Sequence, residues 1–98
     1  ELSKIKVVPN PYIAHSMMNE SEYLKQIRFT HLPIECKIRI YTVTGEFVFE
    51  FNHYSLTDGN EFWDLRTINN QEASPGLYLY AVTTPDNRSF VSKFAIVR

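Results

Sequence analysis

Residues 36–53 read CKIRIYTVTGEFVFEFNH and decide the fold class of this chain. In the first half of the stretch, apolar and polar side chains alternate, which places Cys36, Ile38 and Ile40 on one face of a β-strand. Gly45 follows in a tight turn, because glycine readily adopts the positive φ that a short hairpin needs. The stretch therefore predicts a β-hairpin with one buried face.

The return strand of this hairpin, residues 46–53, allows two registers. Strict alternation places Phe47, Phe49 and Phe51 on one face of the strand. A β-bulge would instead bury Val48 together with Phe51 and leave Phe49 exposed. Since exposed apolar surface often marks a contact, the bulged register makes Phe49 a candidate contact residue.

The rest of the chain breaks into similar short runs separated by turn residues. No segment keeps a helical period, and residues 16–25 are polar and are expected to form a loop. The run at 77–82 is apolar on both faces, which predicts a central strand. About seven short strands without crossover helices predict an all-β fold, an antiparallel β-sandwich of immunoglobulin-like or fibronectin-III-like type. The other β-like runs lie at residues 4–8, 26–30, 61–66 and 90–97.

Bulk composition fits a single domain covering residues 1–98. Of these residues, 44% are apolar and 14% are aromatic, which indicates a globular, β-rich chain. The net charge is −1, and ten basic and eleven acidic side chains are spread without a basic cluster. Nucleic-acid binding is therefore not expected. No apolar run approaches the ~20 residues of a membrane-spanning helix, so membrane insertion is not expected either.

Side chains that could carry catalysis or bind a metal are few and poorly grouped. Cys36 is the only cysteine, so an internal disulfide is excluded, and its position in the alternation makes it a core residue rather than a nucleophile. His15, His31 and His53 do not combine with Cys36 into the paired spacing of a zinc site. The sequence has neither a glycine-rich phosphate loop nor a nucleophile elbow. We expect no enzymatic activity, no metal and no cofactor.

Two aromatic residues allow either a structural or a binding role. Trp63 is interpreted as a core tryptophan of the sandwich, with a sugar-stacking platform as the alternative. Tyr78 is expected to pack in the core with its hydroxyl bonded to nearby backbone, although it could also line a ligand groove. Asp64, directly after the tryptophan, is expected to accept hydrogen bonds from turn amides.

Four motifs, read in order, resemble a known group of bacterial domains. The motifs are Val8–Tyr12, Ile38–Val48, Trp63–Asp64 and Ser74–Tyr78. Together they resemble the immunoglobulin-like C-terminal domains of the FlgD-like and type IX secretion sorting-domain group, and the resemblance covers nearly the whole chain.

The resemblance implies a non-catalytic C-terminal module of an exported bacterial protein, secreted or displayed at the cell surface. Such a module acts in secretion sorting or surface anchoring, and its partners would be the secretion machinery or neighbouring domains of the parent protein. The last strand is the expected contact element, recognised along its edge. Only Lys93 and Arg98 are basic near the end of this chain, whereas the group usually has a more lysine-rich tail. The candidate recognition residues are Pro75, Gly76, Tyr78, Lys93, Phe94, Ile96 and Arg98.

Two other functions remain open from the residues alone. One is a passive structural or assembly module that associates with its parent or with itself through apolar patches around Phe47–Phe51. The other is glycan binding through Trp63 and exposed tyrosines.

Overall fold

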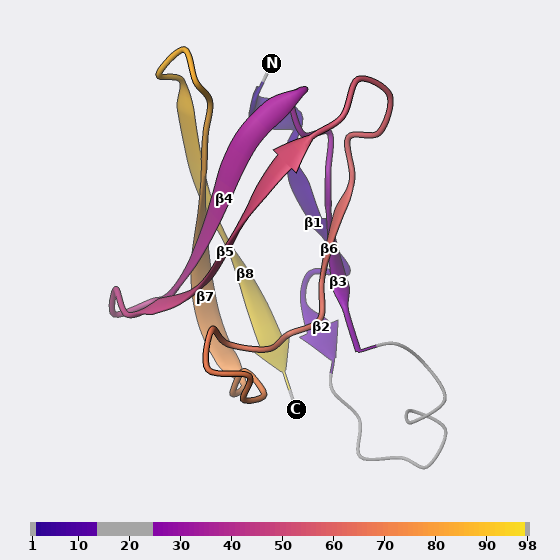
Figure 1. The fold of residues 1–98 in the computed structure, drawn as a ribbon. Coiled ribbons are helices and arrows are strands. Elements are labelled where there is room, and N and C mark those ends of the chain that lie inside the picture. The colour runs from indigo at the N-terminus through magenta and orange to yellow at the C-terminus, as the bar shows by residue number, and fades with distance from the viewer. Residues whose placement is uncertain (1, 14–24, 98) are drawn as a thin grey trace.

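The computed structural model describes residues 2–13 and 25–97 and folds as two β-sheets packed face to face (Figure 1). One sheet has three strands in the order β1-β3-β6, and the other has five in the order β2-β8-β7-β4-β5. The predicted loop at residues 16–25 lies almost wholly outside the described residues. The elements are the 3-10 turn η1 (Leu2–Lys4) and the strands β1 (Lys6–Val8), β2 (Tyr12–Ile13), β3 (Ile27–Thr30), β4 (Glu35–Thr42), β5 (Phe47–Tyr54), β6 (Glu61–Trp63), β7 (Gly76–Thr83) and β8 (Ser89–Val97).

The predicted all-β sandwich is confirmed, with one strand more than the sequence indicated. The additional strand is β2, which follows Pro9 and Pro11 and pairs with β8 in parallel, while every other strand pair is antiparallel. The prolines end β1 as predicted, because they cannot donate to a ladder. The chain then passes from the three-stranded sheet to the five-stranded sheet, where two residues are enough to add an edge strand.

The hairpin of β4 and β5 forms where the sequence predicted it. Cys36, Ile38 and Ile40 are buried on the inner face of β4. At the turn, the Gly45 N–H donates to the Thr42 carbonyl at 2.9 Å, and Gly45 has a φ of 98°. A residue with a Cβ is strained at this φ, so glycine is required for the backbone rather than for space.

The return strand carries the bulge, but the bulge does not expose Phe49. Ile40 is paired with Phe49 and Tyr41 with Phe47, so Val48 is the extra residue on β5. Val48 is buried as the bulged register predicted. Phe49 is partly buried and packs against the core, with its ring 6.4 Å from that of Trp63. The interpretation of Phe49 as an exposed contact is therefore wrong, because the inserted residue lets neighbouring side chains turn to the same side.

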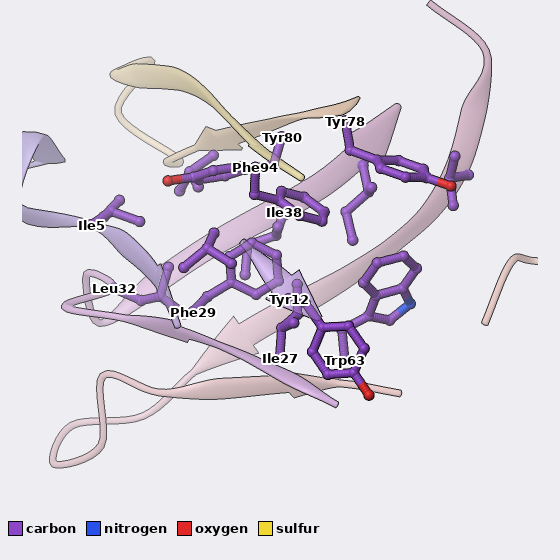
Figure 2. Close-up of a cluster of buried hydrophobic side chains, with 14 of the residues drawn as sticks. Ile5, Tyr12, Ile27, Phe29, Leu32, Ile38, Trp63, Tyr78, Tyr80 and Phe94 are labelled. Carbon is purple, nitrogen blue, oxygen red and sulfur yellow. The ribbon is translucent and has the colours of Figure 1, made fainter. Parts of the chain in front are cut away.

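Trp63 is sealed between the two sheets (Figure 2). Only 1% of its surface is exposed, and its indole Nε1–H donates to the Arg66 carbonyl at 3.0 Å. The Asp64 carboxylate accepts from the Arg66 N–H at 3.1 Å, so its predicted role as a turn acceptor is confirmed. A sugar cannot stack on a ring that solvent does not reach. Glycan binding through Trp63 is therefore excluded.

Tyr78 packs in the core and satisfies its hydroxyl locally, as predicted. Its ring stacks on that of Phe94 with centroids 5.5 Å apart, and its hydroxyl donates to the Ser74 carbonyl at 2.6 Å. This bond ties the loop before β7 to the start of the strand. The tyrosine therefore holds the Pro75-Gly76 corner against the core.

Replacing Tyr78 with phenylalanine is expected to lower the free energy of unfolding by about 1 kcal/mol, because the stacked ring is kept and only one hydrogen bond is lost. Urea denaturation measures the change. Tyr54→Phe is the matched control, since Tyr54 is exposed and no change is expected there. An unchanged midpoint for Tyr78→Phe would show that this bond contributes nothing to stability.

Candidate recognition surface

The predicted recognition residues divide between the core and the surface. Tyr78, Phe94 and Ile96 are buried on the inner face of the five-stranded sheet. Their side chains hold the two sheets together and do not face a partner outside the folded domain. Pro75, Gly76 and Lys93 are exposed, and Arg98 lies outside the described residues. A partner of β8 would therefore meet the alternate residues of this strand.

Those alternate residues belong to an apolar face on the outside of the five-stranded sheet. The register places Leu77 beside Ala95, Leu79 beside Lys93, and Ala81 beside Val91 across β7 and β8. The face continues onto β4 and β5, where Tyr41 and Phe47 meet edge to face with ring centroids 6.1 Å apart. Leu77 is 43% exposed and Val91 is 62% exposed. We call this set the apolar outer face: Tyr41, Val43, Phe47, Leu77, Leu79, Ala81, Val91, Ala95 and Val97.

The sequence carried a signal for this face in the run at residues 77–82. A strand that is apolar on both sides indicates a central position, and β7 does lie between β8 and β4. A central position protects the edges of a strand but does not cover its faces. The side of β7 that faces away from the core has no layer over it in the described part of the chain. The apolar outer face therefore consists of residue types that are usually buried, but the fold leaves it exposed.

On this side of the sheet, the charges around Glu50 are paired, whereas that of Lys93 is not paired with any described residue. Glu50 accepts from Arg39 at 3.0 Å and lies 3.8 Å from the Lys37 ammonium. Lys93 is exposed among the apolar side chains and forms no ion pair with any described residue. A surface that buries this face must therefore supply an acidic group opposite Lys93 or leave its charge unpaired.

The outer edge of β8, the expected contact element, is already occupied along its second half. β2 pairs with Ile96 and Val97. Just before them, the Asn10 side-chain amide donates to the Lys93 carbonyl at 3.4 Å and accepts from the Ala95 N–H at 3.2 Å. The side chain of Asn10 thereby makes hydrogen bonds that the backbone of a neighbouring strand would otherwise make. An added strand cannot pair with this part of β8, so here the face of the sheet is open to a partner and the edge is not.

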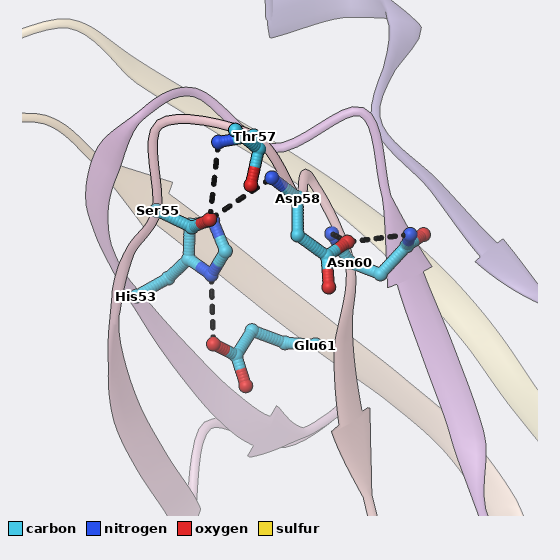
Figure 3. A network of polar contacts seen from close by, with 6 residues as sticks. All are labelled: His53, Ser55, Thr57, Asp58, Asn60 and Glu61. Carbon is cyan, nitrogen blue, oxygen red and sulfur yellow. Dashed lines mark hydrogen bonds and ion pairs between the residues drawn. The ribbon is translucent and has the colours of Figure 1, made fainter.

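A partly buried polar pair, His53 and Glu61, joins the two sheets (Figure 3). His53 on β5 is 2% exposed, and its Nδ1 lies 2.7 Å from a carboxylate oxygen of Glu61 on β6. The Nε2 atom of His53 is buried without a hydrogen-bond partner among the described residues. Sequence reasoning treated this histidine only as a possible metal ligand. No group of three or more metal-binding side chains occurs in the described ranges.

The loop between β5 and β6 brings this pair together (Figure 3). The Ser55 hydroxyl accepts from the backbone N–H groups of Thr57 and Asp58, at 3.2 and 2.9 Å. Asp58 in turn accepts from the Asn60 N–H at 3.0 Å. These local turns satisfy the backbone of the loop as the chain crosses from one sheet to the other. The loop therefore places Glu61 opposite His53.

Cys36 lies opposite His53 in the β4–β5 register, and His53 contacts Glu61 on β6 of the other sheet. A thiol, an imidazole and a carboxylate therefore come from three strands of the two sheets. Burial, and secondarily the negative charge of Glu61, raises the pKa of the Cys36 thiol to about 11. The thiol therefore stays protonated at neutral pH. Because the thiolate is the nucleophilic form, this environment favours a structural cysteine.

The same burial is expected to make the domain less stable at alkaline pH. Burial also raises the pKa of the Tyr78 and Tyr80 hydroxyls. The folded state holds these protons and that of Cys36 more tightly than the unfolded chain does. Their contribution to stability is therefore fully present below the unfolded pKa and is lost as pH rises through the folded pKa.

The free energy of unfolding is accordingly expected to fall from pH 9.0 to about 11, as measured by urea denaturation at a series of pH values. In Cys36→Ala the decline should begin only at the higher pH where the tyrosines ionise. A Cys36→Ala profile parallel to that of the natural sequence would contradict the assignment to the thiol.

Comparisons with known proteins support the fold and leave the function open. No protein family model matches the sequence, and no curated protein matches it significantly. Among solved structures, the chain is similar to PorZ, an essential surface component of the type IX secretion system of Porphyromonas gingivalis. The TM-score is 0.79 at 24% sequence identity, and the match covers 100% of this chain and 12% of that chain. The described residues form no helix long and apolar enough to cross a lipid bilayer.

Proposed function

We propose that this domain is a non-catalytic, C-terminal immunoglobulin-like module of an exported bacterial protein, of the FlgD-like and type IX sorting-domain kind. It acts in secretion sorting or in anchoring the protein at the cell surface. It works by presenting a surface to the secretion machinery or to a neighbouring domain of its parent.

The observation that carries this proposal is the match to PorZ. The whole of this chain corresponds to a small part of a surface component of a type IX secretion system. A similar fold at this identity is evidence of architecture, so the role in sorting rests on the combination with the ordered motifs, such as Ser74–Tyr78. In the folded domain Tyr78 bonds Ser74 and holds that motif in place.

The apolar outer face is the surface that such a role would use. It combines exposed apolar side chains with Lys93, which is unpaired among the described residues. The complementary partner is a protein surface that is apolar at its centre and carries a carboxylate opposite this lysine. Arg39 and Lys37 do not add to this requirement, because Glu50 already neutralises part of their charge.

A reporter fusion in a bacterium with a working type IX system tests the proposal. Residues 1–98 are joined to the C-terminus of a periplasmic reporter, and the reporter is measured at the cell surface and in the medium. Export is the expected result. Retention of the reporter in the periplasm, while a known sorting domain exports it, would overturn the proposal.

Two variants of this fusion test the assigned surface. Leu77→Ser with Lys93→Glu changes the apolar outer face, and we expect export to fall at least about tenfold, equivalent to ~1.4 kcal/mol of lost binding. Phe62→Ser is the matched control, because Phe62 is equally apolar and exposed but lies on the other sheet. Equal loss in both variants would place recognition elsewhere.

A further inference from the structure

The outer edge of β5 is the longest sheet edge that the described residues leave open. The edge strands of the three-stranded sheet, β1 and β6, have three residues each. In the five-stranded sheet, β2 and Asn10 occupy the second half of the β8 edge. The other edge strand, β5, is eight residues long.

Only the beginning of the β5 edge is covered. The Val48 carbonyl points away from β4 and accepts from the Ile68 N–H at 2.8 Å. Backbone polar groups of successive residues in a strand point to opposite edges. The N–H and C=O groups of Glu50, Asn52 and Tyr54 therefore share the outward direction of Val48. No strand of the described part of the chain pairs with them.

Beyond its bulge at Val48, this edge has few of the usual protections against pairing with another strand. Proteins block open edges with proline, charged side chains, β-bulges, very short strands or a covering segment. β5 reads FVFEFNHY, without proline or lysine, and its residue types favour β-structure. Its one carboxylate, Glu50, lies against Arg39 and Lys37 on the face of the sheet. The Glu50 carboxylate therefore does not prevent another strand from pairing with this edge.

We propose that two copies of this domain associate by pairing their β5 strands edge to edge in antiparallel orientation. Their five-stranded sheets then form one continuous sheet around a two-fold axis. The proposal concerns self-association and does not depend on the role in export.

We place the two-fold axis of this pair at Asn52. If the two-fold axis passes through Asn52, each Asn52 lies opposite Asn52 of the second copy, and their side-chain amides can bond each other. Glu50 then lies opposite Tyr54 of the second copy. An axis at Glu50 would oppose two carboxylates, which is destabilising. It would also bring the edge next to Val48 into the interface, where Ile68 already takes the carbonyl.

The geometry of this register allows a position-specific test. Directly opposed residues whose backbone groups bond each other have Cα atoms about 5.5 Å apart, which lies within the range for a disulfide. In a Cys36→Ala background, Asn52→Cys is expected to form a covalent dimer on mild oxidation. Tyr54→Cys is the matched control, because Tyr54 is opposite Glu50 and not opposite itself. Non-reducing electrophoresis reads the result.

A second experiment measures the non-covalent dimer by analytical ultracentrifugation of the unmodified chain. We expect reversible dimers, with a dissociation constant raised at least tenfold in Asn52→Pro, which removes an outward N–H and leaves the β4 ladder intact. Circular dichroism verifies that this variant folds. Asn52→Glu, which opposes two carboxylates, should weaken the dimer in a way that added salt relieves.

Three results would overturn the proposal. The first is a monomer at about millimolar concentration, where even a weak pair should form. The second is an equal disulfide yield from Asn52→Cys and Tyr54→Cys. The third is a dimer that survives Asn52→Pro and Asn52→Glu but is lost in Leu77→Ser, which would place self-association on the apolar outer face.

Discussion

Replacing Trp63 with alanine is expected to lower the free energy of unfolding by about 3–5 kcal/mol. The indole lies between the sheets, with its ring centroid 6.2 Å from that of Phe94, so truncation leaves a cavity that the flanking strands cannot fill. The change also deprives the Arg66 carbonyl of its indole donor. Since small domains are typically stable by only ~5–15 kcal/mol, a loss of this size leaves little stability. Urea denaturation followed by circular dichroism measures it.

The neighbouring residue supplies the control for this prediction. Phe62 is 53% exposed on the outer side of the same strand, and Phe62→Ala is expected to cost about 0.5 kcal/mol or less. The pair separates the effect of burial from the effect of losing an aromatic residue in β6. Comparable losses for Trp63→Ala and Phe62→Ala would contradict the sandwich core described here.

Phe94→Ala is expected to produce a loss of similar size, about 3–5 kcal/mol. The Phe94 ring has its centroid 5.5 Å from that of Tyr78, 6.1 Å from that of Tyr80 and 6.3 Å from that of Phe29, so it is central to the aromatic cluster. Aromatic pairs of this geometry add to the stabilisation that burial alone provides. Chemical denaturation of the variant at neutral pH measures the effect.

The adjacent residue on β8 is again the control. Lys93→Ala is expected to change stability by less than about 0.5 kcal/mol, because its side chain is exposed and unpaired among the described residues. In the reporter assay, by contrast, we expect replacements of Lys93 to weaken export while the domain stays folded. If Phe94→Ala left stability unchanged, its assignment to the core would be wrong.

The residues of β8 alternate between the core and the outer face of the sheet. Along β8, Phe94 and Ile96 stabilise the sandwich, and Lys93, Ala95 and Val97 belong to its outer side. Motif matching cannot separate these roles, because it marks consecutive residues while a strand alternates between two environments. The recognition residues expected from the resemblance are therefore partly structural.

Local pattern was enough to predict most of the architecture. Alternation in residues 36–43 placed Cys36, Ile38 and Ile40 in the core, and the apolar run at 77–82 placed β7 at the centre of its sheet. Such predictions succeed because the two-residue period of a strand fixes which side chains share a face. The hydrogen bond of Tyr78 was predictable for a related reason, since a buried hydroxyl takes a nearby backbone partner.

The tertiary structure alone decided which faces and edges remain open. A local pattern shows that a side chain is apolar, but whether another layer covers it depends on segments far away in the chain. Phe49 is covered because Trp63 comes from the other sheet, whereas Leu77 is left open because no described element crosses β7. Asn10, 83 residues before Lys93, occupies part of the β8 edge, whereas in the described ranges no strand pairs with the β5 edge beyond Val48. Burial is a property of long-range packing, and so the surfaces available for recognition could be found only after the sheets were assembled.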